Sequence, residues 1–462
     1  MKITLKKLTQ YSCIIAMFLW STVNAQHIWD GSTNSDWSEV TNWDSNNAPG
    51  DGNISGLIFI INLGPGGNYP EITADVTLTS GSISVSSGAS LTINSLNTLQ
   101  INSGASLTMS PNSILNVIIA GAINNNGGTV TFQSDDNGSA YIGNSSGSFS
   151  GNYTVERYIP AKRAFRFLSS PVTASSIAAS WQQDTHITGF SGAANGFDTT
   201  NTNLPSMFTF NNATPAWEQV TTTSTSLVAG TPYRIMIRGD RSTNLSSNSA
   251  TPSVTTLSAT GTLSNEGLDQ APLDLNDTGG AWNFVGNPFQ APIDMNLVAT
   301  TAITDFYYVW DPNLSTRGAY ATIVRSTGTN LTPGSAANGY LQPGQAAFVQ
   351  TVGAGGSAVL QFTQASKNTA VGPTAVFKSS KKTESVSKLS LSLYETTALA
   401  ENKSLADAVT IFFDAAYSNE KDDSDAGKLS NIDENFATSI DGVWSSAEQR
   451  ALPTESDEIQ LV

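Results

Sequence analysis

Acidic residues near the end of the chain come closest to the spacing of a metal site. Asp423, Asp425 and Glu434 occupy the first, third and twelfth places of a calcium-binding loop. Carboxylate oxygens are the ligands that this hard cation prefers. However, Lys428 stands where such a loop needs glycine for its sharp turn. Two interpretations stay open, a calcium site at these three residues or a solvated acidic turn, and calcium is the only cofactor that the sequence suggests.

Three tryptophans near the start of the chain could bind a different kind of ligand. Trp29, Trp37 and Trp43 lie within fifteen residues. Flat indole rings cover sugar rings well, so these side chains are candidates for a carbohydrate-binding platform. The alternative is an aromatic cap over the first coil of the repeat that follows. Coplanar, solvent-facing rings would indicate the platform, and rings directed into the first rung would indicate the cap.

Residues for catalysis are scarce. Ser145 lies in a Gly-x-Ser-x-Gly pattern, but a nucleophile elbow needs a buried strand before it and a helix after it, and here the flanks are rich in Ser and Gly. Only His27 and His186 could serve a His-based triad or a zinc hydrolase. Residues 76–134 contain no charged side chain, so the repeat offers no base for a polysaccharide lyase. The sequence therefore predicts a protein without catalytic activity.

A regular apolar ladder dominates the segment that follows the tryptophans. Apolar residues at i and i+2 face one side of a strand, and the pair recurs every eight residues, which stacks one short rung many times. Identical hexapeptides that begin at Ser87 and Ser103 indicate a unit of two rungs, or sixteen residues. We expect a parallel β-solenoid, with an antiparallel meander as the alternative. The first residue of each pair is Ile83, Leu91, Leu99, Leu107, Leu115 or Ile123.

Composition divides the rest of the chain. Short strand-like runs bounded by Gly, Pro and Asn continue to the end, so the predicted fold is all-β, an N-terminal β-solenoid (β-helix-like) followed by β-sandwich-type domains. We expect Trp282, Phe284, Phe306, Tyr308 and Trp310 in the core of the middle domain because they alternate along such runs. The predicted parts are 1–25 (signal peptide), 26–150 (cap and solenoid), 151–375 (β-sandwich-type domain), 376–387 (linker) and 388–462 (acidic β domain, truncated).

The first 25 residues have the pattern of a signal peptide. Three lysines precede an apolar run, and cleavage after Ala25 fits the small-residue rule. That run is shorter than the roughly 20 residues that span a bilayer, and we expect no transmembrane segment in the mature chain. Cleavage removes Cys13, the only cysteine, and moves the formal charge from −16 to about −19. This acidic balance argues against a nucleic-acid partner and is consistent with an extracellular or outer-surface protein.

Several motifs in one order resemble segments of large exported surface proteins of Bacteroidetes. These are the runs 157–161, 166–172, 282–289 and 339–348, together with the acidic tail around 425–437. The resemblance implies export by the type IX secretion system, whose machinery would be a partner. Proteins of this kind end in a β-sandwich sorting domain, and the sequence given shows none, so we expect a fragment, with another export route as the alternative.

The expected function follows from location and architecture. We expect a secreted or cell-surface structural or adhesive protein with no catalysis in this region. Two alternatives stay open: a carbohydrate-binding accessory module, with a surface polysaccharide as its partner, or the non-catalytic stalk of a larger extracellular enzyme.

Overall fold

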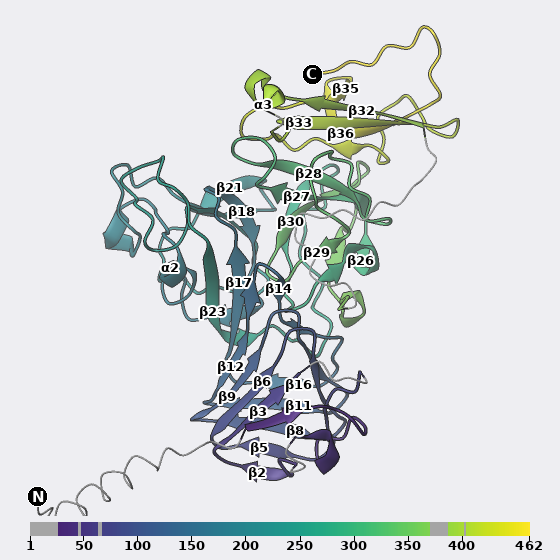
Figure 1. Cartoon of the computed structure of the whole chain (residues 1–462). Coiled ribbons are helices and arrows are strands. Elements are labelled where there is room, and N and C mark those ends of the chain that lie inside the picture. The colour runs from purple at the N-terminus through teal and green to yellow at the C-terminus, as the bar shows by residue number, and fades with distance from the viewer. Residues whose placement is uncertain (1–25, 45–47, 63–66, 370–386, 402) are drawn as a thin grey trace, which may run out of the picture.

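The protein is nearly all β and extends from a stacked solenoid at one end to a separate sheet at the other (Figure 1). The computed structural model describes residues 26–44, 48–62, 67–369, 387–401 and 403–462, so the predicted signal peptide and nearly all of the predicted linker lie outside the described residues. Within them, no helix is both long and apolar enough to cross a bilayer. The helices are short: η1 (Val40–Asn42), α2 (Trp181–Asp184), η2 (Gly192–Asn195), η3 (Met295–Leu297), η4 (Gln364–Ser366) and α3 (Thr396–Ala400).

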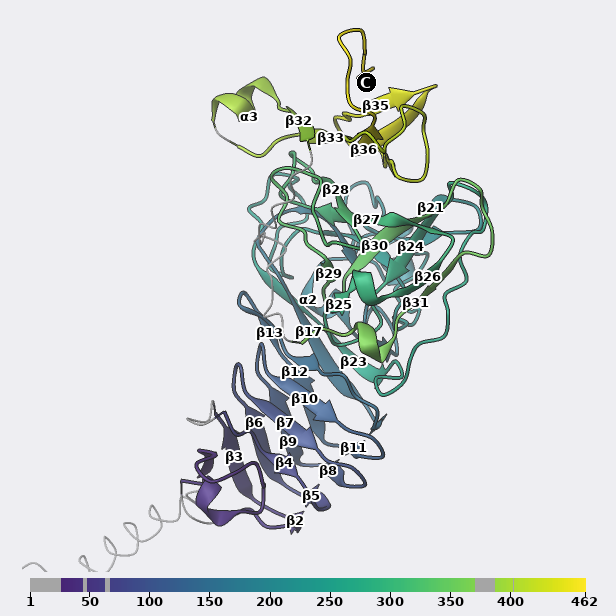
Figure 2. The ribbon, with the colours of Figure 1, turned by 90° about the vertical axis from the view of Figure 1, so that its right-hand side faces the viewer.

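The ladder forms a parallel β-solenoid with three sides, as the stacked coils of Figure 2 show. One side contains β1 (Gln26–Trp29), β3 (Leu57–Ile61), β6 (Gly81–Val85), β9 (Ala105–Met109), β12 (Thr129–Phe132) and β17 (Tyr153–Ile159). The second contains β4 (Glu71–Ile72), β7 (Ser90–Ile93), β10 (Ile114–Val117) and β15 (Tyr141–Ile142). The third contains β2 (Gly52–Ile54), β5 (Val76–Leu78), β8 (Thr98–Asn102), β11 (Ala122–Asn126) and β16 (Ser148–Ser150).

The predicted solenoid is confirmed, but the predicted sixteen-residue unit is wrong. Leu91 pairs with Leu115 and Leu99 pairs with Ile123, each 24 residues further along the chain. One coil therefore consists of three eight-residue rungs, one on each side. The two identical hexapeptides lie on different sides, in β7 and β9, so their identity reflects a shared rung shape and not a shared position.

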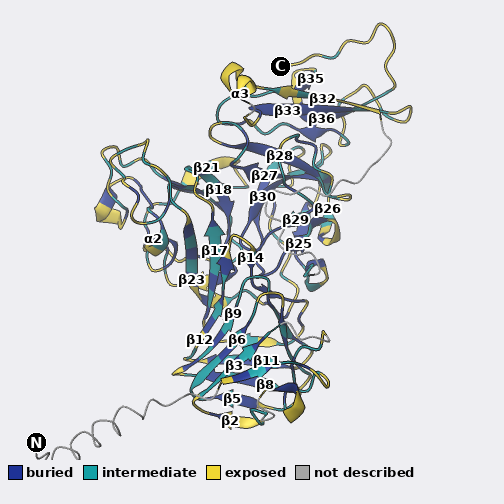
Figure 3. Cartoon of the chain, in the orientation of Figure 1, coloured by how far each residue is buried: buried dark blue, intermediate teal, exposed yellow. Residues whose placement is uncertain are grey.

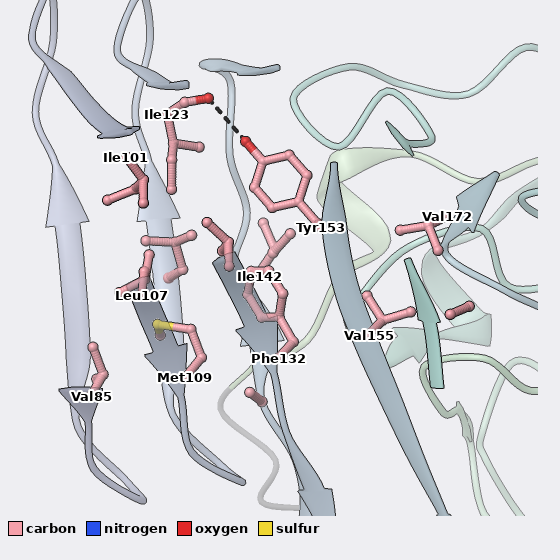
Figure 4. Packing of buried hydrophobic residues seen from close by; sticks show 14 of the residues in the cluster. Val85, Ile101, Leu107, Met109, Ile123, Phe132, Ile142, Tyr153, Val155 and Val172 are labelled. Atoms are coloured by element: carbon pink, nitrogen blue, oxygen red, sulfur yellow. Dashed lines mark hydrogen bonds between the residues drawn. The ribbon is translucent and has the colours of Figure 1, made fainter. Parts of the chain in front are cut away.

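The apolar ladder points inward and fills the solenoid. Leu99, Ile101, Leu107 and Met109 are fully buried in one cluster, as predicted. Figure 4 shows Ile101, Leu107 and Met109 in this cluster. The polar residues between them face outward because side chains alternate along a strand. At one corner Gly81 has φ +96°, and a Cβ there would lie 2.1 Å from the Leu57 carbonyl oxygen, so this corner requires glycine.

The open end of the solenoid is closed by strands from later in the chain. β17 is the last parallel strand of its side, and β23 (Thr255–Leu263) pairs antiparallel with it from Tyr153↔Gly261 to Ile159↔Thr255. β19 (Val172–Ala174) then completes a continuous sheet of eight strands. The Tyr153 hydroxyl also donates to the Ile123 carbonyl oxygen at 3.0 Å (Figure 4). The outer edge of β17 is thereby paired, so this side of the last coil has no exposed sheet edge.

Residues 160–369, here called the head, contain two further four-stranded sheets. The first is β18 (Ala164–Leu168), β22 (Tyr233–Ile237), β20 (Met207–Asn211) and β21 (Ala216–Gln219). The second is β24 (Trp282–Gly286), β30 (Ala346–Thr351), β27 (Ile303–Asp311) and β28 (Ala319–Val324). Two short pairs complete the head. They are β25 (Ile293–Asp294) with β29 (Tyr340–Leu341) and β26 (Ala299–Thr301) with β31 (Val359–Gln361). A further pair, β13 (Ser134–Asp135) with β14 (Gly138–Ser139), projects from the solenoid.

Both faces of the second head sheet are buried, as the dark strands in Figure 3 show. Tyr307 and Val309 pack into one apolar cluster, whereas Phe306, Tyr308 and Trp310 pack into another. Phe284 is buried in the second cluster and Trp282 is partly buried against it, so the predicted aromatic core is confirmed.

The C-terminal sheet covers the outer face of this aromatic cluster. Its strands are β32 (Ser387–Leu393), β33 (Asp407–Phe413), β36 (Val443–Arg450), β34 (Ala426–Gly427) and β35 (Thr438–Ile440). Ala426 and Ala447 from this sheet lie in the same buried cluster as Tyr308 and Trp310. The acidic tail is thus packed against the head.

A buried ion pair fastens the head to the solenoid. The Lys367 ammonium lies 2.6 Å from a Glu266 carboxylate oxygen, and neither side chain is exposed. The ammonium also donates to the Gly143 carbonyl oxygen at 3.3 Å and lies 4.5 Å from the centre of the Phe289 ring. Because Gly143 follows β15 of the last coil, this lysine connects the two parts directly.

Candidate functional site

The three predicted tryptophans form a cap and do not present their faces to solvent. Trp29, Trp37 and Trp43 are each 1% exposed. Trp43 makes edge-on contacts with Trp29 and Trp37 at centroid distances of 5.1 and 5.0 Å, and all three belong to the solenoid core with Phe59. Two indole N–H groups are used internally, since Trp43 donates to the Trp37 carbonyl and Trp29 donates to the Asn68 carbonyl. These rings cannot stack on a sugar, so the carbohydrate platform predicted here is not formed.

The predicted calcium ligands are not brought together. In the described part of the chain, no group of three or more His, Cys, Asp or Glu side chains could hold a metal ion. Asp425 is buried, and its oxygens accept the Gln449 N–H at 2.7 Å and the Asp422 N–H at 3.1 Å. Asp423 instead accepts the Gly353 N–H at 2.6 Å. Hydrogen bonds to the backbone thus occupy the carboxylates that the sequence pattern assigned to calcium, and Glu434 lies apart from them.

Ser145 has a structural role. Its side chain is 1% exposed, and its hydroxyl oxygen accepts the Val117 N–H at 3.2 Å. Its own N–H donates to the Gln364 side chain of the head at 3.3 Å. The residue therefore joins the last coil to the head, and it is not presented as a nucleophile.

A cavity lies where the solenoid meets the head, and we call it the junction cavity. Its volume is about 340 Å³, within the range typical of small-molecule sites. Its walls come from the β13–β14 hairpin, the end of β17, strand β18, the end of β27 and a loop before β30. The lining residues are Ser134–Ser139, Arg157–Pro160, Arg166–Leu168, Trp310, Pro312, Gln342 and Gln345.

Arg157 brings a positive charge to an inward position of the solenoid sheet. Tyr153, Val155 and Arg157 alternate along β17 and share one face, and the first two are buried in the solenoid core. Among the described residues, no hydrogen bond or ion pair reaches the Arg157 guanidinium, and its Nε is buried without a partner. Burial lowers the pKa of Arg157, opposed by the nearby Tyr141. A guanidinium with unsatisfied donors therefore lines the cavity.

Arg166 brings a second guanidinium to the same cavity. It is 8% exposed, and it donates to the Phe165 carbonyl at 3.2 Å and to the Lys162 carbonyl at 3.3 Å. Burial lowers the pKa of Arg166 to about 10, opposed by the charge of Asp311. No carboxylate of the described chain lies within ion-pair distance of Arg166. Burial raises the pKa of Asp311, although the Ser335 hydroxyl donates to it at 2.7 Å.

The β13–β14 turn places two carboxylates at the edge of the cavity. Asp135 and Asp136 are exposed. Asp135 accepts the Asn137 and Gly138 N–H groups at 2.8 and 3.2 Å, which fixes the turn. Asp136 accepts from the Asn137 side chain at 3.1 Å through one oxygen. The cavity thus combines cationic and apolar walls with an acidic edge.

The position of Arg157 in the sequence is a signal of this site. Arg157 follows Tyr153 and Val155 at the same alternation, so it is the first charged residue at an inward position after the apolar ladder. A charged residue at such a position is either paired or functional. Nothing in the sequence, however, places Trp310 beside it.

The chain belongs to the family described as a domain of unknown function (DUF8693), whose profile matches residues 28–462. The match includes the cap, the solenoid, the head and the C-terminal sheet. No curated protein and no solved structure matches the chain.

Proposed function

We propose that this protein is a secreted or cell-surface structural or adhesive protein that carries its head on a rigid solenoid and catalyses no reaction in this chain. The eight-stranded sheet carries the proposal, because it runs from β1 at the capped end through β17 and into β23 and β19 of the head side. A body that shares backbone hydrogen bonds across its parts resists bending at their junction. The buried Lys367–Glu266 pair and the Gln290 side chain, which donates to the Ala140 carbonyl at 2.8 Å, reinforce the same boundary.

An outer location is part of the proposal. The signal-peptide pattern and the resemblance to type IX cargo of Bacteroidetes support it, and the uncharged, outward-facing Ser, Thr and Asn rows of the solenoid suit an exposed spacer. Surface biotinylation of intact cells that produce the protein should label it. Labelling only after cell lysis would contradict the proposed location.

Rigidity gives the sharpest structural test. Ile119 on the solenoid and Leu204 on the head are 67% and 59% exposed, so cysteines can replace them without disturbing a core. Spin labels at Ile119→Cys and Leu204→Cys, in a chain that begins at Gln26 and so lacks Cys13, should give a narrow distance distribution. A broad distribution would show a hinge at the junction and overturn the rigid-spacer proposal.

The same chain should show no turnover of pectin, alginate or glucan.

A further inference from the structure

We propose that the junction cavity binds a carboxylate-bearing sugar, such as one uronic acid unit of an acidic polysaccharide, with Arg157 and Arg166 as the residues that hold its carboxylate. A planar guanidinium matches a carboxylate with two parallel hydrogen bonds. The Arg157 Nε is buried without a partner, and among the described residues Arg166 donates only to two backbone carbonyls. A monovalent anion between them would supply the acceptors that the described chain does not provide.

The unsatisfied guanidinium is costly in the absence of a ligand, and this favours a built site over an accident of packing. A polar group that is buried without a hydrogen bond costs about 1–3 kcal/mol. The inward face of β17 is otherwise apolar, with Tyr153, Val155 and Ile159 all buried. A leucine or valine at position 157 would continue that face at no such cost. A bound anion would offset this cost.

The edge of the cavity selects against highly charged anions. Asp135 and Asp136 lie at the mouth, and Asp311 lies close to Arg166. These three carboxylates outnumber the two arginines, so each further negative charge on a ligand adds repulsion, and a ligand with one negative charge is repelled less than a doubly charged phosphate ester.

The remaining walls distinguish a sugar from an apolar acid. Asp136 has an oxygen that accepts no hydrogen bond from the described residues and could accept one from a ligand hydroxyl. Ile159, Pro160 and Trp310 provide apolar surface for the C–H face of a pyranose ring. An aliphatic or aromatic acid would satisfy the arginines but would bring no donors to the acidic edge. Ligand binding at this cavity depends neither on the cellular location of the protein nor on its rigidity. A failure of the binding experiment would therefore leave the proposed function intact, and the reverse also holds.

Titration calorimetry on the chain from Gln26 tests the proposal with trigalacturonate as the probe. Galactotriose is the matched neutral sugar, and inorganic phosphate and octanoate are the matched anions. We expect binding of trigalacturonate alone. Arg157→Gln should weaken that binding about tenfold or more, because it removes a charge-assisted pair. Arg317→Gln, which removes an exposed guanidinium that pairs with Asp433 and does not line the cavity, should leave binding unchanged.

Stability provides a second readout that a purely structural arginine would not show. Because Arg157 is unpartnered, Arg157→Gln should unfold at the same or a higher temperature than the unaltered chain while it binds less sugar. A large loss of thermal stability would mean that Arg157 holds the fold, and it would overturn the proposal. Equal binding of galactotriose, tighter binding of phosphate or octanoate, or no binding of trigalacturonate would overturn it as well.

Discussion

The solenoid and the head solve the same problem, the burial of a large surface, with different side chains. Residues 76–134 contain no charged side chain, and their coils bury Ile, Leu, Val and Met in a repeating order. The head and the C-terminal sheet bury whole ion pairs, Lys367 with Glu266 and Lys428 with Asp407. A repeated coil meets only copies of itself, so apolar contacts suffice. The Lys367–Glu266 pair lies where the head meets the solenoid, and it favours one arrangement there because a shifted arrangement would leave a buried charge alone.

The largest effect should come from breaking the pair at the junction. Lys367→Met leaves the Glu266 carboxylate buried without its partner, and we expect a loss of about 3–5 kcal/mol in the free energy of unfolding. Denaturant titration measures it. The double variant Lys367→Met, Glu266→Leu should recover most of the loss, because no charge remains. Lys403→Met, which breaks an exposed pair with Glu401, is the matched control and should change nothing measurable. If Lys367→Met and Lys403→Met lowered the free energy of unfolding equally, burial of the Lys367–Glu266 pair would contribute nothing special. The contrast between the solenoid and the head would then fail.

A core variant of the solenoid sharpens the same contrast. Leu99→Ala should cost about 2–5 kcal/mol, because it leaves a cavity at a fully buried position. Ile119→Ala, at an exposed position of the same coil, should have little effect. The loss from Leu99→Ala should be nearly the same at low and high salt, since the contacts that it removes are apolar. Unchanged unfolding of the Leu99 variant would mean that the assigned register is wrong.

The smallest expected effect is the pH dependence of stability, which should have opposite signs in the cap and in the head. In the cap, hydrogen bonds from the Ser38 N–H and from the Ser38 and Thr73 hydroxyls lower the pKa of Asp36 below 3.8. Burial acts in the opposite direction but is outweighed. The ionised Asp36 therefore stabilises the fold above pH 3.8, and this stabilisation is lost as the pH falls through the lowered pKa. In the head, burial raises the pKa of Asp311. The stability associated with this group is therefore fully present below pH 3.8 and is lost as the pH rises through the raised pKa.

Hydrogen exchange resolved along the chain measures how amide protection in the cap and in the head changes with pH. Protection of residues 28–44 should decrease below pH 3.8, by less than about 1 kcal/mol because solvent screens this carboxylate. The Asp36→Asn variant should lose that pH dependence. If cap and head responded to acid with the same sign, the assignment of these two carboxylates would be wrong.

The sequence predicted the solenoid because its signal is local and repeated. Alternation with a period of two and a spacing of eight residues fixes which side chains of each rung point inward, and Leu99 and Ile101 do so. The number of sides could not be predicted in this way, because three rungs per coil and two rungs per coil place the same residues inside. Only the pairing of Leu99 with Ile123 decides between them.

The candidate site was mostly hidden from the sequence because its parts are distant along the chain. Arg157 and Trp310 line one cavity although more than 150 residues separate them. The motifs that did attract attention failed for a common physical reason. Indoles and carboxylates serve a fold as readily as a ligand, and here the backbone uses them first, as the Asp425 oxygens and the Trp43 N–H show.

The pairing of β17 with β23 sets an order of events while the chain is being made. Each coil of the solenoid can pair with its neighbour as soon as it is free to fold, because its partner strand precedes it by about one coil. β17 finds β12 in this way, but its other edge stays open until residues 255–263 have been synthesised. About a hundred residues of head must therefore emerge before the last rung is closed on both sides. During that interval one edge of β17 stays unpaired, and the strand of a second chain could pair with it by mistake.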